Sequence, residues 1–147
     1  MTDEKLTARI RERYLAIKAQ IATAAESVGR APESVQLVVV TKAQSAEVTQ
    51  AAINGGAQVL GENYPEQAVM KMQAMSKKNK VEWHMIGHVQ SRKANLVAEN
   101  FALLHSLDSL KLAKRLDRLA AEASRTLPVL LEINIGGEIS KFGWNVP

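Results

Sequence analysis

The sequence of 147 residues contains no cysteine and no long apolar run. Without cysteine the chain forms neither disulfide bonds nor thiolate metal sites, and thiol catalysis is excluded. No window approaches the roughly 18 uninterrupted apolar residues of a membrane-spanning helix. The amino-terminal stretch MTDEKLTARIRERY is charged and does not have the pattern of a secretion signal. We therefore expect a soluble, unexported, cytoplasmic protein without a membrane partner.

A dense basic block is also missing. The formal net charge is +4 and the sequence pI is about 9.5, but the lysines and arginines are spread along the expected helices without interleaved aromatic residues. Nucleic-acid binding requires clustered positive charge, so we do not expect nucleic acid as a partner. The positive charge is compatible with an anionic ligand. Histidine, aspartate and glutamate nowhere have the spacing of a metal site, so no metal is expected.

The sequence does contain a regular alternation of apolar strands and amphipathic helices. Its hydrophobic content of 46% is sufficient for the core of one domain. We predict an opening helix at about residues 3–28, followed by strands and helices that alternate at a repeat of roughly 20 to 26 residues. The predicted strands are 35–41, 57–61, 81–87, 101–107 and 127–135, and the helices between them are 45–54, 65–75, 90–100 and 109–125, the last capped by Asp108.

This alternation predicts right-handed βαβ units and therefore an α/β fold with a parallel sheet. An open doubly wound sheet and a (β/α)₈ barrel both fit the pattern, although a full barrel typically needs about 250 residues and eight strands. No linker interrupts the five predicted strands, so we expect residues 1–147 to form a single domain. The chain ends in KFGWNVP directly after a strand, without a helix to cover that strand.

Polar residues follow each predicted strand. Lys42 follows the first strand, Glu62 and Asn63 follow the second, His88 follows the third, and Lys141 lies in the segment after the fifth. Because all strands of a parallel sheet point the same way, their carboxyl ends meet at one edge, where binding sites are built. The sequence therefore predicts a site that collects amines, a carboxylate, an amide and an imidazole.

The residues alone leave the roles at this edge open. A lysine at the inner rim of a sheet loses part of its hydration, which favours the neutral amine that forms a Schiff base with an aldehyde or ketone. Lys42 could instead extend into solvent or pair with Glu62. Asn63 could cap the helix that begins at Pro65, and His88 could bond only to backbone in its loop.

Five blocks of sequence carry a family resemblance: VVVTK, GENYPEQA, EWHMIGHVQSRK, HSLDSLKLA and INIGGEISKFG. In this order and spacing, from about residue 35 to 143, they resemble the pyridoxal phosphate homeostasis family of the YggS or PROSC type. The resemblance implies a TIM barrel like the N-terminal domain of alanine racemases, present here as an incomplete barrel of about five of the eight β/α units. It also implies a cofactor, pyridoxal 5'-phosphate, held as an aldimine on Lys42.

Further site residues are implied by the same resemblance. Glu62 and Asn63 would line the cofactor pocket with Gly61, His88 would lie close to it, and Lys141 would lie at its mouth. The family's segments that clamp the cofactor phosphate come from the last barrel strands and are absent here, so we expect weak or labile binding. Members hold or deliver the cofactor for vitamin B6 homeostasis, with apoenzymes that depend on pyridoxal phosphate as possible recipients, and we assign no catalytic residue.

Two other functions stay open. One is a fold-type III enzyme resembling an amino-acid racemase, which would need acid and base groups on both faces of the cofactor. The other is a truncated barrel with little independent function. Five of eight strands would leave unpaired edges, so self-association through those edges is expected.

Overall fold

The structure is a computed structural model that describes residues 3–75 and 80–145. The helices are α1 (Asp3–Glu26), α2 (Ala46–Asn54), α3 (Pro65–Ala74), α4 (Ala94–Asn100) and α5 (Leu110–Glu122), with short 3₁₀ helices η1 (Pro32–Ser34) and η2 (Ser91–Lys93). The strands are β1 (Val39–Val40), β2 (Val59–Glu62), β3 (Glu82–Met85), β4 (Leu103–Leu107), β5 (Val129–Leu131), β6 (Ile133–Asn134) and β7 (Trp144–Asn145).

Strands β1 to β5 form one parallel sheet in the order in which they occur in the chain. Leu60 of β2 lies opposite Val39 on one side and Trp83 on the other, so the first three strands are in register. A sequential order is that of a β/α barrel, because a doubly wound sheet reverses direction at a switch point. The prediction of an α/β fold with a parallel sheet is confirmed.

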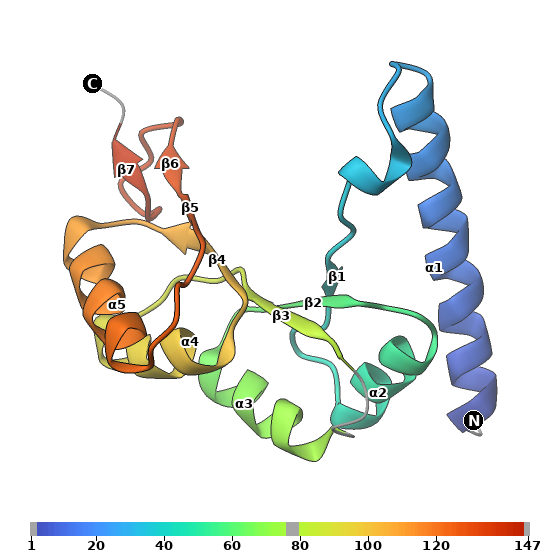
Figure 1. The fold of residues 1–147 in the computed structure, drawn as a ribbon, viewed down its shortest axis with the longest axis horizontal. Helices are drawn as coiled ribbons and strands as arrows, with labels where there is room; N and C mark the ends of the chain where they lie inside the picture. Colours follow the sequence, from blue (N-terminus) through green and yellow to red (C-terminus); the bar gives the residue numbers. More distant parts are fainter. Residues whose placement is uncertain (1–2, 76–79, 146–147) are drawn as a thin grey trace.

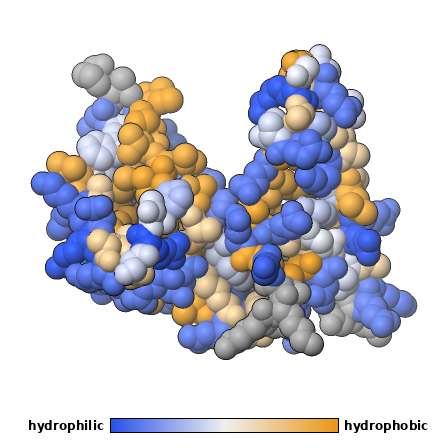
Figure 2. Space-filling model, in the orientation of Figure 1, coloured by the Kyte–Doolittle hydropathy of each residue, from blue (hydrophilic) through white to orange (hydrophobic). Residues whose placement is uncertain are grey.

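Helices α2 to α5 cover one face of this sheet (Figure 1). The hydrophobic core lies between the two layers and contains the fully buried side chains of Leu60, Met85, Val97, Phe101 and Leu104. The described residues place no helical layer on the opposite face. Figure 2 shows the molecule hollowed on that side, between an arm that carries α1 and an arm that carries β6 and β7.

Several helix boundaries follow from local chemistry. Gly29, with φ of 70°, lies just after α1, as expected for a residue that stops a helix. Ser45 caps α2 through its side chain, which accepts from the amide of Val48, and Pro65 occupies the first turn of α3. The predicted cap of α5 was wrong by one residue, because the side chain of Ser109, not Asp108, accepts from the Leu112 amide.

The first and fifth strands are shorter than predicted. Only Val39–Val40 of residues 35–41 is a strand. The predicted strand 127–135 is divided, since Glu132 donates its amide to Leu107 at the end of β4 and the next two residues pair with β7. The Trp144 indole also donates to the carbonyl of Leu107, at 2.9 Å. The β6–β7 pair is thus attached to the end of β4.

Large apolar side chains remain exposed after β4. Leu130 is 50% exposed, Leu131 60% and Ile135 87%. Within the described ranges, no helix has the length and apolar character needed to cross a membrane. These three residues belong to the last strands and their connection, which lie at one edge of the molecule (Figure 1).

Two histidines on neighbouring strands form a hydrogen-bonded pair inside the sheet. His105 Nε2 lies 3.0 Å from Nδ1 of His84, which is almost fully buried. Burial lowers the pKa of both histidines, and the charge of His105 lowers the pKa of His84 further, while Glu82 acts in the opposite direction at 3.7 Å. The hydrogen bond needs one ring to donate and the other to accept, so the two rings cannot both be protonated while it is made.

We predict that this pair makes the fold sensitive to mild acid. The folded pKa values lie below the ordinary value near 6.5, so below that pH the unfolded chain binds more protons and the free energy of unfolding falls. The slope is at most about 1.4 kcal/mol per pH unit for each histidine. Urea titrations between pH 7 and pH 5 measure it, and the double variant His84→Gln/His105→Gln should lose most of the slope. An unchanged slope would contradict the assignment.

Candidate functional site

The carboxyl ends of β1, β2 and β3 carry four of the predicted site residues, Lys42, Glu62, Asn63 and His88. After β1, the Thr41 amide donates to the Gly61 carbonyl, and the chain then turns over residues 41–44, closed by a bond from the Gln44 amide to the Thr41 carbonyl at 3.1 Å. Ala43, the third residue of this Lys42 turn, has φ of 59°. Positive φ at that position is typical of a type II turn, and it is strained for any residue except glycine.

Lys42 is exposed at this turn, and it makes no hydrogen bond or ion pair with the described part of the chain. Side chains of a strand alternate between faces, and Thr41 is on the face covered by helices, where it contacts Glu62. By the same alternation Val38 and Val40 belong to the open face. Lys42 is the second residue of the turn that follows this extended backbone, and its side chain is exposed.

Gly61 provides space on that open face. A Cβ atom at this position would lie 3.0 Å from Ile86 Cδ1 and 3.1 Å from Val38 Cγ1. The two side chains thus meet over the backbone of β2, below the Lys42 turn. Gly61, the first residue of the Gly-Glu-Asn sequence at residues 61–63, is therefore needed for these two side chains to pack against β2.

Glu62 points the other way and is fully buried. Its Oε1 accepts hydrogen bonds from Lys71 Nζ at 2.6 Å and from the Thr41 hydroxyl at 2.7 Å. Lys71 Nζ also donates to the Thr41 carbonyl, at 2.7 Å. The partner of Glu62 is therefore Lys71 and not Lys42. We call Thr41, Glu62 and Lys71 the buried triad; the sequence analysis assigned no role to Thr41 or Lys71.

Asn63 and His88 share one cavity of about 310 Å³, which we call the Asn63–His88 cavity. The loops after β2 and β3 touch here, because a Cβ atom at Gly87 would lie only 2.5 Å from the carbonyl oxygen of Asn63. Tyr64, not Asn63, is the cap residue of α3, so the capping role considered for Asn63 is wrong. The cavity volume is at the lower end of the range of about 300–1,000 Å³ for small-molecule sites.

His88 is held from two sides. Its Nδ1 lies 2.7 Å from Asp108 Oδ2, and its ring stacks on Phe142 with centroids 3.5 Å apart and planes 9° from parallel. An ionised carboxylate only accepts, so Nδ1–H donates to Asp108 and Nε2 is left to accept or take a proton. The possibility that His88 bonds only to backbone is therefore wrong.

Lys141 lies apart from the other predicted residues. Its ammonium pairs with Glu138 at 2.8 Å, and it lines a second cavity of about 380 Å³ within the loop between β6 and β7. The link to His88 is its neighbour Phe142. The structure thus brings Asn63 and His88 together, ties Glu62 to the turn before Lys42, and leaves Lys141 on the adjoining arm.

The positive charge near the Asn63–His88 cavity is partly neutralised. Lys93 lines that cavity and pairs with Glu66 of α3. The hydrogen bond from Lys93 lowers the pKa of the Glu66 carboxyl, which stays ionised. Among the described residues, no group of three or more histidines, aspartates and glutamates could hold a metal ion.

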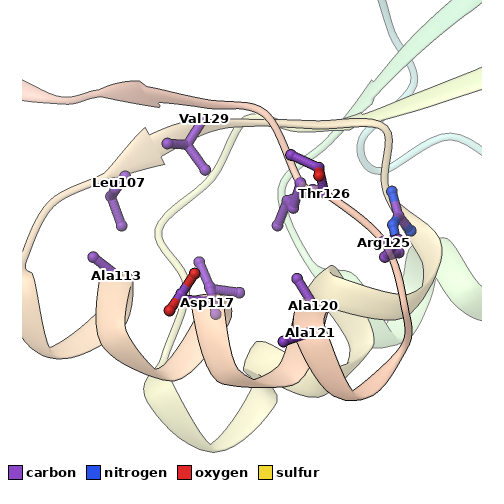
Figure 3. Close-up of a pocket in the computed structure, with 10 residues that line it drawn as sticks. Leu107, Ala113, Asp117, Ala120, Ala121, Arg125, Thr126 and Val129 are labelled. Atoms are coloured by element: carbon purple, nitrogen blue, oxygen red, sulfur yellow. The ribbon is translucent and has the colours of Figure 1, made fainter.

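A third cavity lies outside the strand-end region. It is bounded by α5 on one side and by β4 and β5 on the other, and its lining is mainly apolar (Figure 3). Leu107, Ala113 and Val129 are among its lining residues, with Asp117 and Arg125 as the charged ones. It contains none of the predicted site residues and lies between a helix and the sheet. We therefore place the candidate site at the strand ends.

A parallel sheet in sequential order, with helices on one face and a lysine after its first strand, defines a domain of the β/α-barrel type. The model of the family described as alanine racemase, N-terminal domain, matches residues 14–146, and the chain belongs to this family.

Two relatives of this chain carry the name pyridoxal phosphate homeostasis protein. The pyridoxal phosphate homeostasis protein of Vibrio alginolyticus is 40% identical over 130 residues, which are 86% of this chain and 56% of that protein. The protein of the same name from Escherichia coli K12 is 38% identical over 129 residues, again 86% of this chain and 55% of the relative. The chain therefore spans little more than half the length of these relatives.

Solved structures agree with the fold. PipY from Synechococcus elongatus, without pyridoxal phosphate, is 33% identical with a TM-score of 0.80, covering 92% of this chain and 58% of that one. The structure of PipY with the cofactor bound gives a TM-score of 0.76 and covers 57% of that chain. The predicted resemblance to the pyridoxal phosphate homeostasis family is confirmed.

We predict that Gly87→Ala destabilises the protein by about 1–3 kcal/mol, the range for inserting a group into a packed site. The new Cβ would collide with Asn63 backbone, which cannot rotate away. Gly136→Ala is the matched control, because its Cβ would meet nothing closer than 3.5 Å. Urea denaturation compares the two, and equal midpoints would show that the two loops are not in contact.

Proposed function

We propose that this chain binds pyridoxal 5'-phosphate through Lys42 and takes part in intracellular vitamin B6 homeostasis. The observation that carries the proposal is the exposed amine of Lys42, free of described partners, at the carboxyl end of the first strand. It is supported by membership of the family and by the relative PipY, 33% identical, whose structure contains this cofactor.

The residues at the strand ends suit the aldehyde half of the cofactor. When bound, the cofactor supplies a carbonyl carbon that a primary amine attacks, and Lys42 has such an amine. Asn63 and His88 would line the ring, with His88 Nε2 available as donor or acceptor. Glu62 would act indirectly, because its carboxylate is bonded to Lys71 and Thr41.

The described residues offer fewer groups for the phosphate half of the cofactor than for its aldehyde half. Phosphate sites in proteins use several backbone amides of a helix terminus or nest. Lys93, which lines the Asn63–His88 cavity, is paired with Glu66, and the neighbouring Arg92 donates its Nε to Gln90, another lining residue. We therefore propose that this chain holds the cofactor mainly through Lys42, with Lys141 at the mouth of the site, and releases it readily.

We propose that this chain binds and delivers the cofactor and does not catalyse a reaction with it, because Lys42, Asn63, His88 and Lys141 suit binding better than catalysis. The proposed recipients are apoenzymes that use pyridoxal phosphate, and the proposed location is the cytoplasm. We also propose that residues 1–147 form a single domain with about five of the eight units of a barrel. Self-association through the exposed residues Leu130, Leu131 and Ile135 is part of the proposal.

We predict that pyridoxal 5'-phosphate followed by borohydride leaves a stable pyridoxyl group on Lys42 at near-stoichiometric cofactor, mapped by peptide mass spectrometry. Lys42→Arg keeps the positive charge but has no primary amine, so total labelling should fall at least about tenfold. Lys141→Ala removes the positive charge proposed for the mouth of the site, so it should retain the Lys42 adduct and lose unreduced cofactor faster on dilution.

The result that removes the proposal is labelling spread over surface lysines to the same extent in the parent protein and in Lys42→Arg. The enzyme alternative has its own assay. Racemisation or transamination of amino acids above the background of free cofactor would replace the binding proposal with an enzymatic one.

A further inference from the structure

The buried triad is the second group of polar residues near Lys42, and nothing in the proposed binding chemistry uses it directly. It joins the residue after β1, the end of β2 and the last turn of α3. Glu62 has no exposed surface and Lys71 is 9% exposed, so the charges lie in the layer between sheet and helices. Buried ion pairs of this kind are weak evidence for stability, because desolvation offsets their attraction.

We infer that Lys71, held by Glu62, sets the conformation of the Lys42 turn through the Thr41 carbonyl, and that Lys71 is the positioning residue. The inference rests on the proposed function, because it assigns a purpose to the direction of the Lys42 side chain. In the part of the chain that the structure describes, Lys71 bonds to Glu62 and to the Thr41 carbonyl but not to Lys42. It acts through the Thr41 carbonyl, which belongs to the peptide group that joins Thr41 to Lys42.

The Thr41 carbonyl receives two donors. Lys71 Nζ approaches it from α3 at 2.7 Å, and the amide of Gln44 closes the turn onto it at 3.1 Å. Fixing that oxygen fixes the plane of the peptide group, and with it the direction in which the chain enters Lys42. The charged donor is the stronger of the two.

Two further observations point to positioning. Ala43 has φ of 59°, a conformation that persists only where the surroundings enforce it. In addition, Glu62 Oε2 is buried without a hydrogen-bond partner among the described residues, while Oε1 receives both donors. A carboxylate bonded through one oxygen is not arranged for the greatest stability. Its arrangement does fix the Lys71 ammonium against the Thr41 carbonyl.

The buried triad also gives Lys71 and Lys42 different roles. Lys71 is buried and bonded to two oxygens, so it is unavailable to an aldehyde. Lys42 is exposed and follows the residue that Lys71 holds. The buried lysine would orient the exposed lysine without competing with it for the cofactor.

The test compares Lys71→Met with Thr41→Val in the full chain. Methionine keeps the unbranched stem and removes the ammonium. Valine has nearly the shape of threonine, and it leaves the Thr41 carbonyl available to Lys71. Each protein is incubated with pyridoxal 5'-phosphate and reduced, and labelling of Lys42 is measured relative to the exposed residues Lys111 and Lys114 of α5.

We expect Lys71→Met to lower the relative labelling rate of Lys42 roughly tenfold, about the factor that loss of one charge-assisted hydrogen bond represents. Thr41→Val should stay near the parent value. Carbon-13 NMR of alanine-labelled protein should locate Ala43 at positive φ in the parent and in Thr41→Val, and should find a changed Ala43 shift in Lys71→Met.

A rescue experiment separates positioning from general loss of structure. Glycine adopts positive φ without strain, so Ala43→Gly added to Lys71→Met should recover part of the labelling. If Lys71→Met does not fold, Glu62→Gln keeps the shape of the triad, removes the charge that holds Lys71, and should lower labelling in the same direction.

The inference is overturned if Lys71→Met, or Glu62→Gln in its place, labels Lys42 at the parent rate with an unchanged Ala43 signal. Absence of a Lys42 label in the parent protein would instead count against the proposed function. In that case the Ala43 signal still reports whether Lys71 sets the turn, so the two failures are distinguishable.

Discussion

The parallel hydrogen-bonding register of β1 to β4 is the constraint on which the rest of this structure depends. The sheet follows chain order with Leu60 between Val39 and Trp83, so successive strands end at neighbouring points of one edge. The helices return the chain along a single face (Figure 1). A shift of one residue in any strand would exchange its two faces. The Glu62 carboxylate would then turn to the open face, and the Lys42 turn would lose its support.

The two faces of the sheet have different chemistry. On the helical face, the core side chains are buried, and Thr41, Glu62 and Lys71 are bonded to one another, although Glu62 Oε2 has no partner among the described residues. The open face holds Val40, Gly61 and the histidine pair, and it borders the hollow seen in Figure 2. A site on this side gains access to solvent, and it must take its rigidity from the other side. The bond from Lys71 to the Thr41 carbonyl is one such connection through the sheet.

Much of this arrangement was predictable from the sequence. Strand and helix order, the stop at Gly29 and the position of Lys42 follow from periodicity and from the rule that parallel strands end together. The extent of β1 was not, because VQLVVVT is uniformly apolar and does not indicate where pairing begins. The cap of α5 was not either, since Asp108 and Ser109 are both good caps and only the tertiary contact with His88 distinguishes them.

Lys71 was missed although the sequence contained a signal for it. Pro65, Ala68 and Lys71 recur every third residue of α3, and all three are buried. Pro65 and Ala68 indicate which face of α3 points inward. Lys71 lies on the same face, so its ammonium needs a hydrogen-bond acceptor inside the protein. A lysine in a helix is usually expected to face solvent, so the sequence did not lead us to predict a buried Lys71.

The division between Asp108 and Ser109 shows how neighbouring residues can serve the fold and the site separately. Ser109 satisfies an amide at the start of α5, a task that any short polar side chain performs. Asp108 is thereby free to hold His88 Nδ1, which leaves Nε2 as the ring's free nitrogen, while Phe142 covers one face of the ring. The tautomer and orientation of His88 therefore depend on the residue that follows β4 and on the loop between β6 and β7. Lys42, in contrast, is supported from the buried layer, so the two sides of the candidate site differ in what holds them.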